Sequence, residues 1–244
     1  QYLKDKGISA SDIFVNYTPF GHSDWSKIVS DVVALGADGK KVGVISTING
    51  DANIGFYKEL AAANISADKI PVVAFSVGEE ELSGLDTSNL VGHLAAWNYF
   101  QSAESDINSE FIKAWKARMG NKRVTNDPME AHYIGFNMWV NAVKQAGTTN
   151  VDAVRTAMYG QKFPNLTGGT AEMLTNHHLS KPVLIGEIKA DGQFDIISQT
   201  EPVPGDAWTD FLAESAVLKS DWKGLGCGMY NTNTKTCIQL KSNY

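Results

Sequence analysis

The sequence of 244 residues lacks the features expected of a membrane-spanning or nucleic-acid-binding protein. No uninterrupted apolar run approaches the ~20 residues that a transmembrane helix needs. The formal net charge is −6, so the basic face that binds phosphate backbones is not expected. The apolar share of 43% and the charged share of 20% are instead typical of a soluble globular protein.

Motifs for catalysis and for metal binding are also missing. The sequence has no Gly-x-Ser-x-Gly or His-Glu-x-x-His motif, and neither cysteine has a plausible histidine partner. The adjacent pair His177-His178 favours a surface turn over a metal site. Gly168-Gly169 is too short for a phosphate-binding loop. We therefore expect a protein that binds without turnover and carries neither a metal nor a cofactor.

Cysteine is scarce, since only Cys227 and Cys237 occur. The Asn- and Thr-rich stretch between them can turn back on itself, and a disulfide across it would stabilise the fold by about 2.5–3 kcal/mol. Such a bridge predicts an oxidising compartment, such as a periplasm or a cell surface. Free thiols are the alternative, whereas a zinc site would need further ligands that this tail lacks.

What the sequence does contain is a polar cluster directly after each of two short apolar runs. The runs at residues 41–48 and 71–76 read as buried strands, and ligands of open α/β sheets bind just beyond the carboxyl ends of parallel strands. The candidates at these strand ends are Thr47, Asn49, Gly50, Asp51, Ser76 and Glu79. Hydroxyl, amide and acidic groups together predict a site for a small, neutral, hydrogen-bonding ligand.

Strand and helix patterns alternate through the first hundred residues. This order predicts βαβ units and a mostly parallel sheet that is covered on both faces. The expected strands are 12–18, 41–48, 71–76 and 93–100, and the expected helices are 23–35, 51–63 and 79–85. Ser23 is expected to cap the first of these helices.

Helices dominate from residue 104 onward, and a hairpin follows them. The helices are expected from residue 106 or 109 to 119, at 127–146 and at 151–158, and the hairpin strands at 183–189 and 194–200. The helix at 127–146 is apolar nearly all round, so it needs cover on every side. Either the first unit packs against it, or a second lobe encoded upstream of this sequence does. We favour the second, because the strands already found have helices of their own.

Six segments resemble a known family. They are residues 15–25 (VNYTPFGHSDW), 46–53 (STINGDAN), 73–81 (VAFSVGEEE), 92–100 (GHLAAWNYF), 126–133 (NDPMEAHY) and 165–170 (NLTGGT). All six are similar to the urea-binding subunits of urea ABC transporters, which are type I periplasmic solute-binding proteins of the branched-chain-amino-acid and amide class. The likeness covers essentially the whole chain.

The resemblance implies an α/β, type I periplasmic-binding-protein fold, with two lobes built on doubly wound parallel sheets. This chain resembles only the C-terminal portion of such proteins and lacks most of the first lobe. By that comparison residues 1–103 belong to the second lobe, residues 104–182 are a helical return to the first lobe, and residues 183–244 return to the second lobe and end in the cysteine-bearing tail. The implied partners are urea or a short amide, the permease subunits of an ABC transporter and the missing N-terminal lobe, in a periplasmic or other extracytoplasmic location.

Urea has one carbonyl acceptor and four N–H donors, so its site must offer several acceptors and a flat wall. Carboxylates suit the N–H groups because charge-assisted hydrogen bonds are the stronger kind. We expect Glu79 to accept one of them, and Trp97 and Tyr99 to form a wall or line the crossover between lobes. The alternatives are a helix cap for Asp51, and core or hinge packing for the two aromatic residues.

A second candidate function has the same fold. A cytoplasmic amide sensor would couple ligand closure to a regulator instead of a permease. The cysteine pair discriminates between the two, because a formed Cys227–Cys237 bridge favours export and reduced thiols favour the sensor.

Overall fold

The computed structural model describes residues 2–37, 39–205, 218–220, 229–231, 234 and 236–238. The chain divides into two compact units, a large one of Asn16–Gly205 and a smaller one drawn from both ends of the chain. Within the described residues, every helix is too short or too polar to cross a lipid bilayer.

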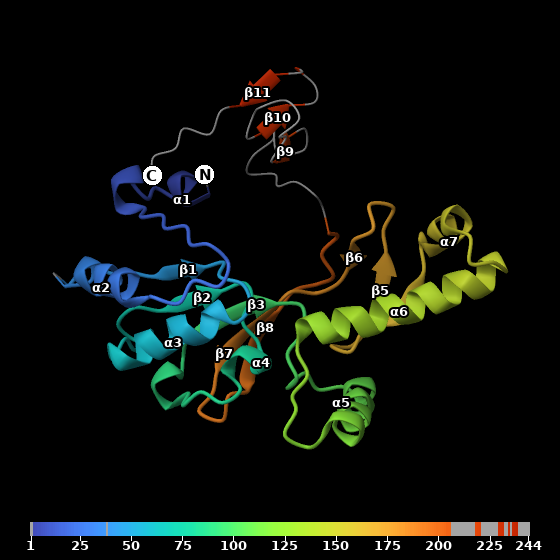
Figure 1. Cartoon of the computed structure of the whole chain (residues 1–244), viewed down its shortest axis with the longest axis horizontal. Coiled ribbons are helices and arrows are strands. Elements are labelled where there is room, and N and C mark those ends of the chain that lie inside the picture. The colour runs from blue at the N-terminus through green and yellow to red at the C-terminus, as the bar shows by residue number, and fades with distance from the viewer. Residues whose placement is uncertain are drawn as a thin grey trace. The chain divides into compact units, whose positions relative to one another are not determined.

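A five-stranded sheet with the order β1-β2-β3-β7-β8 organises the large unit (Figure 1). Its strands are β1 (Val44–Ser46), β2 (Val72–Ala74), β3 (Leu94–Trp97), β7 (Leu184–Ile188) and β8 (Phe194–Gln199). The first three run parallel, whereas β7 is antiparallel to β3 and β8 is antiparallel to β7. The carboxyl ends of β1, β2 and β3 therefore meet at one edge of the sheet, as the sequence predicted.

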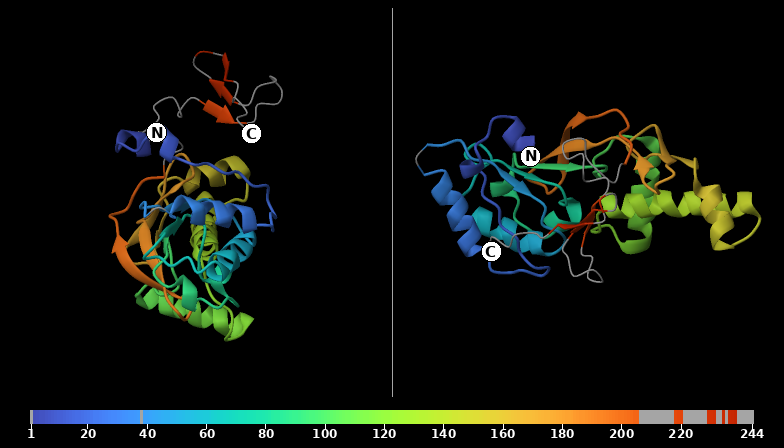
Figure 2. Two further views of the ribbon diagram at one scale, coloured as in Figure 1. Left: turned by 90° about the vertical axis from the view of Figure 1, so that its left-hand side faces the viewer. Right: turned by 90° about the horizontal axis from the view of Figure 1, so that it is seen from above.

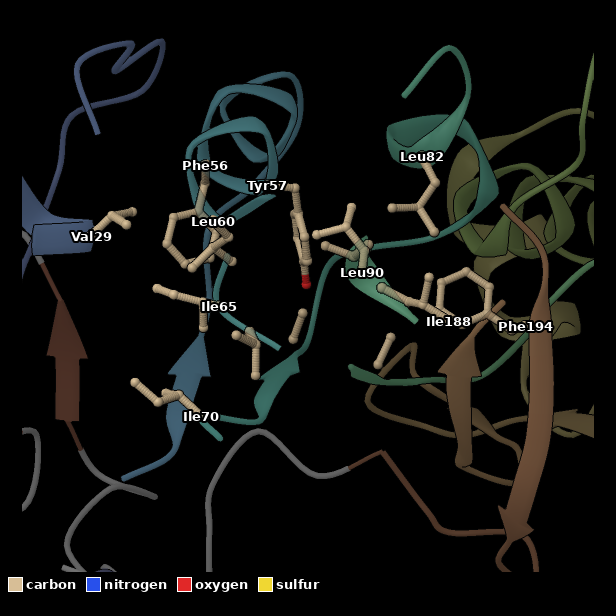
Figure 3. Close-up of a cluster of buried hydrophobic side chains, with 14 of the residues drawn as sticks. Val29, Phe56, Tyr57, Leu60, Ile65, Ile70, Leu82, Leu90, Ile188 and Phe194 are labelled. Atoms are coloured by element: carbon tan, nitrogen blue, oxygen red, sulfur yellow. The ribbon is translucent and has the colours of Figure 1, made fainter. Parts of the chain in front are cut away.

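The helices α2 (Ser26–Leu35), α3 (Ala52–Ala62) and α4 (Glu79–Leu82) pack against one face of this sheet. In α3 the core residues Phe56 and Tyr57 lie four and three positions before Leu60, so both share one side of the helix with it. Figure 3 shows them above the strands, in line with Val29 of α2 and Leu82 of α4. Burying each such side chain contributes about 1.5–3 kcal/mol, which holds the strand ends in place.

The other face of the sheet is less covered than expected. Helices were predicted on both faces, but α2, α3 and α4 share a single hydrophobic core on one of them. On the strands themselves, Ile45 of β1 is 58% exposed and Ile197 of β8 is 51% exposed.

The predicted strand at residues 12–18 is wrong. Residues Ala10–Asp12 form a 3₁₀ turn, and the residues after it have no regular secondary structure. Phe14, Val15 and Tyr17 are exposed. An apolar run becomes a strand only where a neighbouring strand supplies ladder hydrogen bonds, and within the described residues no strand pairs with this segment.

The predicted cap of α2 is wrong by two residues. The helix starts at Ser26 with Trp25 at the N-cap, not at Ser23. The Asp24 carboxylate accepts hydrogen bonds from the Ser26 backbone N–H (3.3 Å) and hydroxyl (2.6 Å). An aspartate one position before the N-cap therefore satisfies the first backbone N–H of the helix.

The residues between β3 and β7 form a helical segment with cores of its own. It contains α5 (Asp106–Met119), α6 (Asp127–Ala146), α7 (Val151–Met158), β4 (Lys162–Pro164), β5 (Thr170–Met173) and β6 (Leu179–Ser180). Figure 2 shows the helices of this segment beside the five-stranded sheet rather than on its face. Its apolar clusters share no residue with the core of the sheet. The division into lobes at residues 104 and 182 stays a prediction.

Both ends of α6 are capped. The Asn126 side chain accepts a hydrogen bond from the Met129 N–H (3.2 Å), Pro128 lies in the first turn, and Gly147 ends the helix with φ +64°. The helix buries Ile134 and Met138 but leaves Phe136 exposed, so only part of its apolar surface has cover in this chain.

The smaller unit contains α1 (Tyr2–Asp5) and an antiparallel sheet with the order β11-β10-β9. Its strands are β9 (Leu218–Ser220), β10 (Met229–Asn231) and β11 (Thr236–Ile238). Cys237 lies on β11, opposite Tyr230. The predicted disulfide lies outside the described residues, because Cys227 is not among them, and so does the short helix expected near Trp208 and Phe211.

Candidate functional site

The candidate site is the edge where β1, β2 and β3 end. It consists of residues 47–51, 75–78 and 97–98, which we call the strand-end edge. The first turn of α6 reaches it as well. A methyl group placed on Gly78 would lie 3.3 Å from the Trp97 ring and 3.5 Å from the Asn126 Cβ. The strand-end edge therefore brings three β-strand termini and one helix start together.

Four of the predicted residues lie on the exposed loop after β1. Thr47, Asn49, Gly50 and Asp51 are all exposed, and Gly50 takes the left-handed conformation that favours glycine, with φ +65°. Asp51 occupies the N-cap of α3, but its side chain makes no capping hydrogen bond. Its carboxylate therefore does not cap the helix, which was the alternative role considered for Asp51 from the sequence.

Ser76 and the buried Asn53 connect this loop to the loop after β2. Ser76 is half-buried, and its carbonyl oxygen accepts a hydrogen bond from the Asn53 side-chain amide (3.2 Å). The same amide donates to the carbonyl oxygens of Ile48 (2.8 Å) and Gly50 (3.2 Å). Sequence patterns gave no signal for Asn53, because it has the features of an ordinary residue in the first turn of a helix.

Glu79 lies deeper than the sequence suggested. Its side chain is 1% exposed, and its Oε1 accepts a hydrogen bond from the Gln101 N–H (2.6 Å). Burial, reinforced by the nearby charges of Glu81 and Asp127, raises the pKa of the Glu79 carboxyl to about 8. At neutral pH it is therefore mostly protonated. A direct contact between Glu79 and a ligand stays a prediction.

The two neighbouring glutamates have other partners. The Glu81 Oε2 accepts from the Gly78 N–H (2.9 Å), and burial raises the pKa of this carboxyl. Glu80 makes an exposed ion pair with Arg123 (3.3 Å). Both interactions hold the start of α4 beside the strand-end edge.

The two aromatic candidates differ in position. Trp97 is half-buried beside Gly78, at the strand-end edge. Tyr99 is fully buried, and its hydroxyl donates to the Asn108 Oδ1 (2.8 Å) and lies 2.7 Å from the Thr125 hydroxyl. Tyr99 therefore lines the crossover into the helical segment, which is one of the two roles expected for it.

A second buried network lies where the chain passes between the sheet and the helical segment. The Asn98 N–H donates to Asp127 (2.8 Å), and the Asn98 side chain donates to the Pro182 carbonyl oxygen (2.8 Å). Lys181 donates to the fully buried Glu130. Burial outweighs the favourable charge of Lys181 and raises the carboxyl pKa of Glu130 to about 7 and that of Asp127 to about 6. Sequence patterns gave no signal for this network.

Within the described residues, no three His, Cys, Asp or Glu side chains are arranged to hold a metal ion. The chemistry available at the strand-end edge is thus hydrogen bonding from hydroxyl, amide, carboxylate and backbone groups, next to one indole ring. Such an arrangement is suited to hydrogen bonding with a small polar molecule.

The parallel sheet, the separate helical segment and the polar strand-end edge define a ligand-binding domain of the α/β class. Residues 1–214 match the family described as periplasmic binding protein domain, and the chain belongs to this family.

Solved structures show the same fold. A solute-binding protein of an ABC transporter from Rhodopseudomonas palustris HaA2, in complex with p-hydroxybenzoic acid, is 18% identical with a TM-score of 0.66, covering 77% of this chain and 51% of that chain. A branched-chain amino acid ABC transporter periplasmic ligand-binding protein from Burkholderia xenovorans LB400 is 17% identical with a TM-score of 0.60, over 76% of this chain and 50% of that chain. The chain thus spans about half the length of these relatives.

A protein named limonene hydroxylase from Geobacillus stearothermophilus is 33% identical over 134 residues. The matched part is 54% of this chain and 24% of that protein. This likeness is partial, and it carries no conclusion about catalysis.

Proposed function

We propose that this chain forms one wall of a cleft that captures urea or another short, neutral amide and delivers it to the permease of an ABC transporter. The observation that carries the proposal is the strand-end edge, where Thr47, Asn49 and Asp51 stand exposed beside Ser76 and Trp97. Membership of the periplasmic binding protein family supports an extracytoplasmic location.

The charge of the strand-end edge favours a neutral ligand over an anion. Solute-binding proteins with this fold have been solved with 3,4-dihydroxybenzoic acid and with benzoate. Residues 47–51, 75–78 and 97–98 contain the acidic Asp51 and neither lysine nor arginine. The benzoate carboxylate would meet a like charge there, whereas the N–H groups of urea would meet an acceptor.

The opposite wall of the cleft belongs to the first lobe, most of which is encoded upstream of this sequence. Two observations support this part of the proposal. The chain spans about half of its structural relatives, and α6 exposes Tyr133, Phe136 and Trp139 on a helix that is otherwise part of a core. A lobe packed on these aromatic side chains would bury the exposed face of α6, and it would lie opposite the strand-end edge. Ligand binding would then close the two lobes about the crossover.

Isothermal titration calorimetry on the protein extended by its upstream lobe tests the proposal. Urea, formamide, acetamide and benzoate are titrated in turn. We expect binding of at least one amide, and we expect Asp51→Ala to weaken it tenfold or more, or about 1.4 kcal/mol. The exposed Asp68, which precedes β2 at the other end of that strand, provides the matched control Asp68→Ala. Preference for benzoate, or equal effects of both substitutions, contradicts the proposal.

The protein should also bind its ligand without turning it over. Nothing in the described part of the strand-end edge pairs a nucleophile with a base. Incubation with urea should therefore release no ammonia above the rate without protein. Catalytic ammonia release would show that the reading as a binding protein is wrong.

A further inference from the structure

We infer that Asn53 is a positioning residue, whose side-chain amide fixes the loops after β1 and β2 as one ligand-facing surface. The inference rests on the proposed function for its effect on ligand affinity, but its structural part stands without it. Asn53 does not touch the ligand in this account. It acts through the backbone of the residues that do.

The contacts of Asn53 join segments that are distant in sequence. Its Nδ2 donates to Ile48 O (2.8 Å) and Gly50 O (3.2 Å) in the first loop, and to Ser76 O (3.2 Å) in the second. The side chain is 0% exposed. Beyond the β1–β2 ladder, this amide is the side-chain group that links the two loops in the described structure.

Asn53 is itself held rigidly. It is the second residue of α3, and the next turns of this helix bury Phe56, Tyr57 and Leu60 in the core of the sheet. The Asn53 side chain therefore transmits the fixed position of α3 to both loops. A polar group on a flexible loop would lack this anchor.

Capping does not explain why asparagine stands here. The N-cap of α3 is Asp51, so the role of Asn53 is not that of a helix cap. The carboxamide donates to the carbonyl oxygens of Ile48 and Ser76, and also to that of Gly50, which accepts from the Asn53 backbone N–H as well. Its own Oδ1 is buried and has no partner among the described residues, a feature that ordinarily costs about 1–3 kcal/mol. The hydrogen bonds to the two loops therefore account for an asparagine at this position, despite its unpaired oxygen.

The carbonyl contacts also determine what the loops present outward. Because the oxygens of Ile48, Gly50 and Ser76 turn inward to Asn53, they are not the groups that contact the ligand. The exposed side chains of Thr47, Asn49 and Asp51 remain for that purpose. Asn53 thus sets both the spacing of the two loops and the choice of groups at the strand-end edge.

Native-state hydrogen exchange on the unaltered protein is the first test. The Asn53 N–H bonds to Gly50 O in the first loop (3.0 Å), and the Gly78 N–H bonds to Glu81 just after the second (2.9 Å). If one amide ties both loops, these two protons exchange through a shared opening, with protection factors within threefold of each other and the same response to denaturant. Protection factors that differ more than tenfold overturn the inference, whether or not urea binds.

The second test compares Asn53→Ala with Asn165→Ala. Asn165 is a matched control, because it is also buried and also has an unpartnered Oδ1, and within the described residues its side chain donates only to Thr167 in its own turn (2.6 Å). We expect Asn53→Ala to lower the protection of Gly78 and to weaken urea binding at least tenfold. Asn165→Ala should leave both within twofold, even where it lowers stability.

The outcomes separate the two claims. If the unaltered protein, extended by its upstream lobe, binds no amide, the proposed function fails, and the exchange data still decide the role of Asn53. If the unaltered protein binds urea and Asn53→Ala binds it equally well, the positioning role is wrong. If Asn53→Ala does not fold, the exchange test on the unaltered protein remains decisive.

Discussion

Single buried carboxyl groups give this protein an unusual dependence on pH. The pKa of Glu79 is about 8 in the folded chain, against about 4.5 for an ordinary glutamate. Between these values the folded state keeps a proton that the unfolded chain has released. The free energy of unfolding therefore falls as the pH rises from about 5 to 8. Glu130 and Asp127 act in the same direction over narrower ranges, because their carboxyl pKa values are raised to about 7 and about 6.

The free energy of unfolding can be measured by guanidinium titrations across pH 5 to 8. Urea cannot serve as the denaturant, because it is the proposed ligand. We expect Glu79→Gln to be about as stable as the parent protein at pH 6, since glutamine imitates a protonated glutamate and can still accept from Gln101. The slope of stability against pH should flatten in this variant. An unchanged slope would show that Glu79 titrates as an ordinary carboxyl group.

A second prediction concerns the buried ion pair between Lys181 and Glu130. Both side chains are buried, so Lys181→Met leaves a carboxylate without a counter-charge, and we expect a loss of about 3–5 kcal/mol at pH 8. The loss should shrink at pH 5, where Glu130 binds a proton. Equilibrium unfolding at both pH values measures it.

The double variant Glu130→Gln with Lys181→Met is the control for this pair. Replacing both charges removes the unpaired ion, and stability should return to within about 1–2 kcal/mol of the parent. A double variant as unstable as Lys181→Met alone would mean that the methionine disturbs packing instead.

At the scale of elements, α6 has two unequal faces. Met138 is 0% exposed within an apolar cluster, whereas its neighbour Trp139 is 43% exposed and stacks only on Phe136 within the described residues. In the 244-residue chain we expect Met138→Ala to cost about 2–5 kcal/mol and Trp139→Ala less than about 1 kcal/mol. Thermal unfolding of the two variants compares them directly.

Trp139→Ala also tests whether the proposed upstream lobe packs on α6. In a protein that carries the upstream lobe, Trp139 would be buried, and Trp139→Ala should become as costly as Met138→Ala. An equally small effect in both proteins would mean that nothing packs on this face of α6.

Elements with a strong periodic pattern were predictable from the sequence. Strands β1 and β2 lie in β-branched runs, and α6 has an asparagine cap at one end and a glycine at the other. Strands β4 to β6 were missed because they have two to four residues each, and β4 includes Pro164, which does not suggest a strand. The segment 12–18 has the right composition for a strand, but composition does not provide a neighbour with which to pair.

At the scale of the whole site, the sequence located the loops but not their connections. The positions of Thr47, Asn49 and Asp51 follow from the rule that parallel strands end at one edge. The tie from Asn53 to Ser76 and the burial of Glu79 depend on contacts between residues more than twenty positions apart. Local patterns carry no information about such contacts.

The crossover between the sheet and the helical segment also depends on contacts between distant parts of the chain. Asn98, Asp127 and Pro182 belong to three separate passages of the chain, and two hydrogen bonds of 2.8 Å join them. In the proposed two-lobed protein this junction is where closure would bend the chain.

An NMR titration of the protein extended by its upstream lobe tests the central claim most directly. Backbone amide signals are followed as urea is added well below denaturing concentrations. We expect saturable shifts at residues 47–51, 75–78 and 97–98, with small changes elsewhere in Asn16–Gly205 apart from the crossover. Saturable shifts that avoid the strand-end edge, or no saturable shift with any short amide, would contradict it.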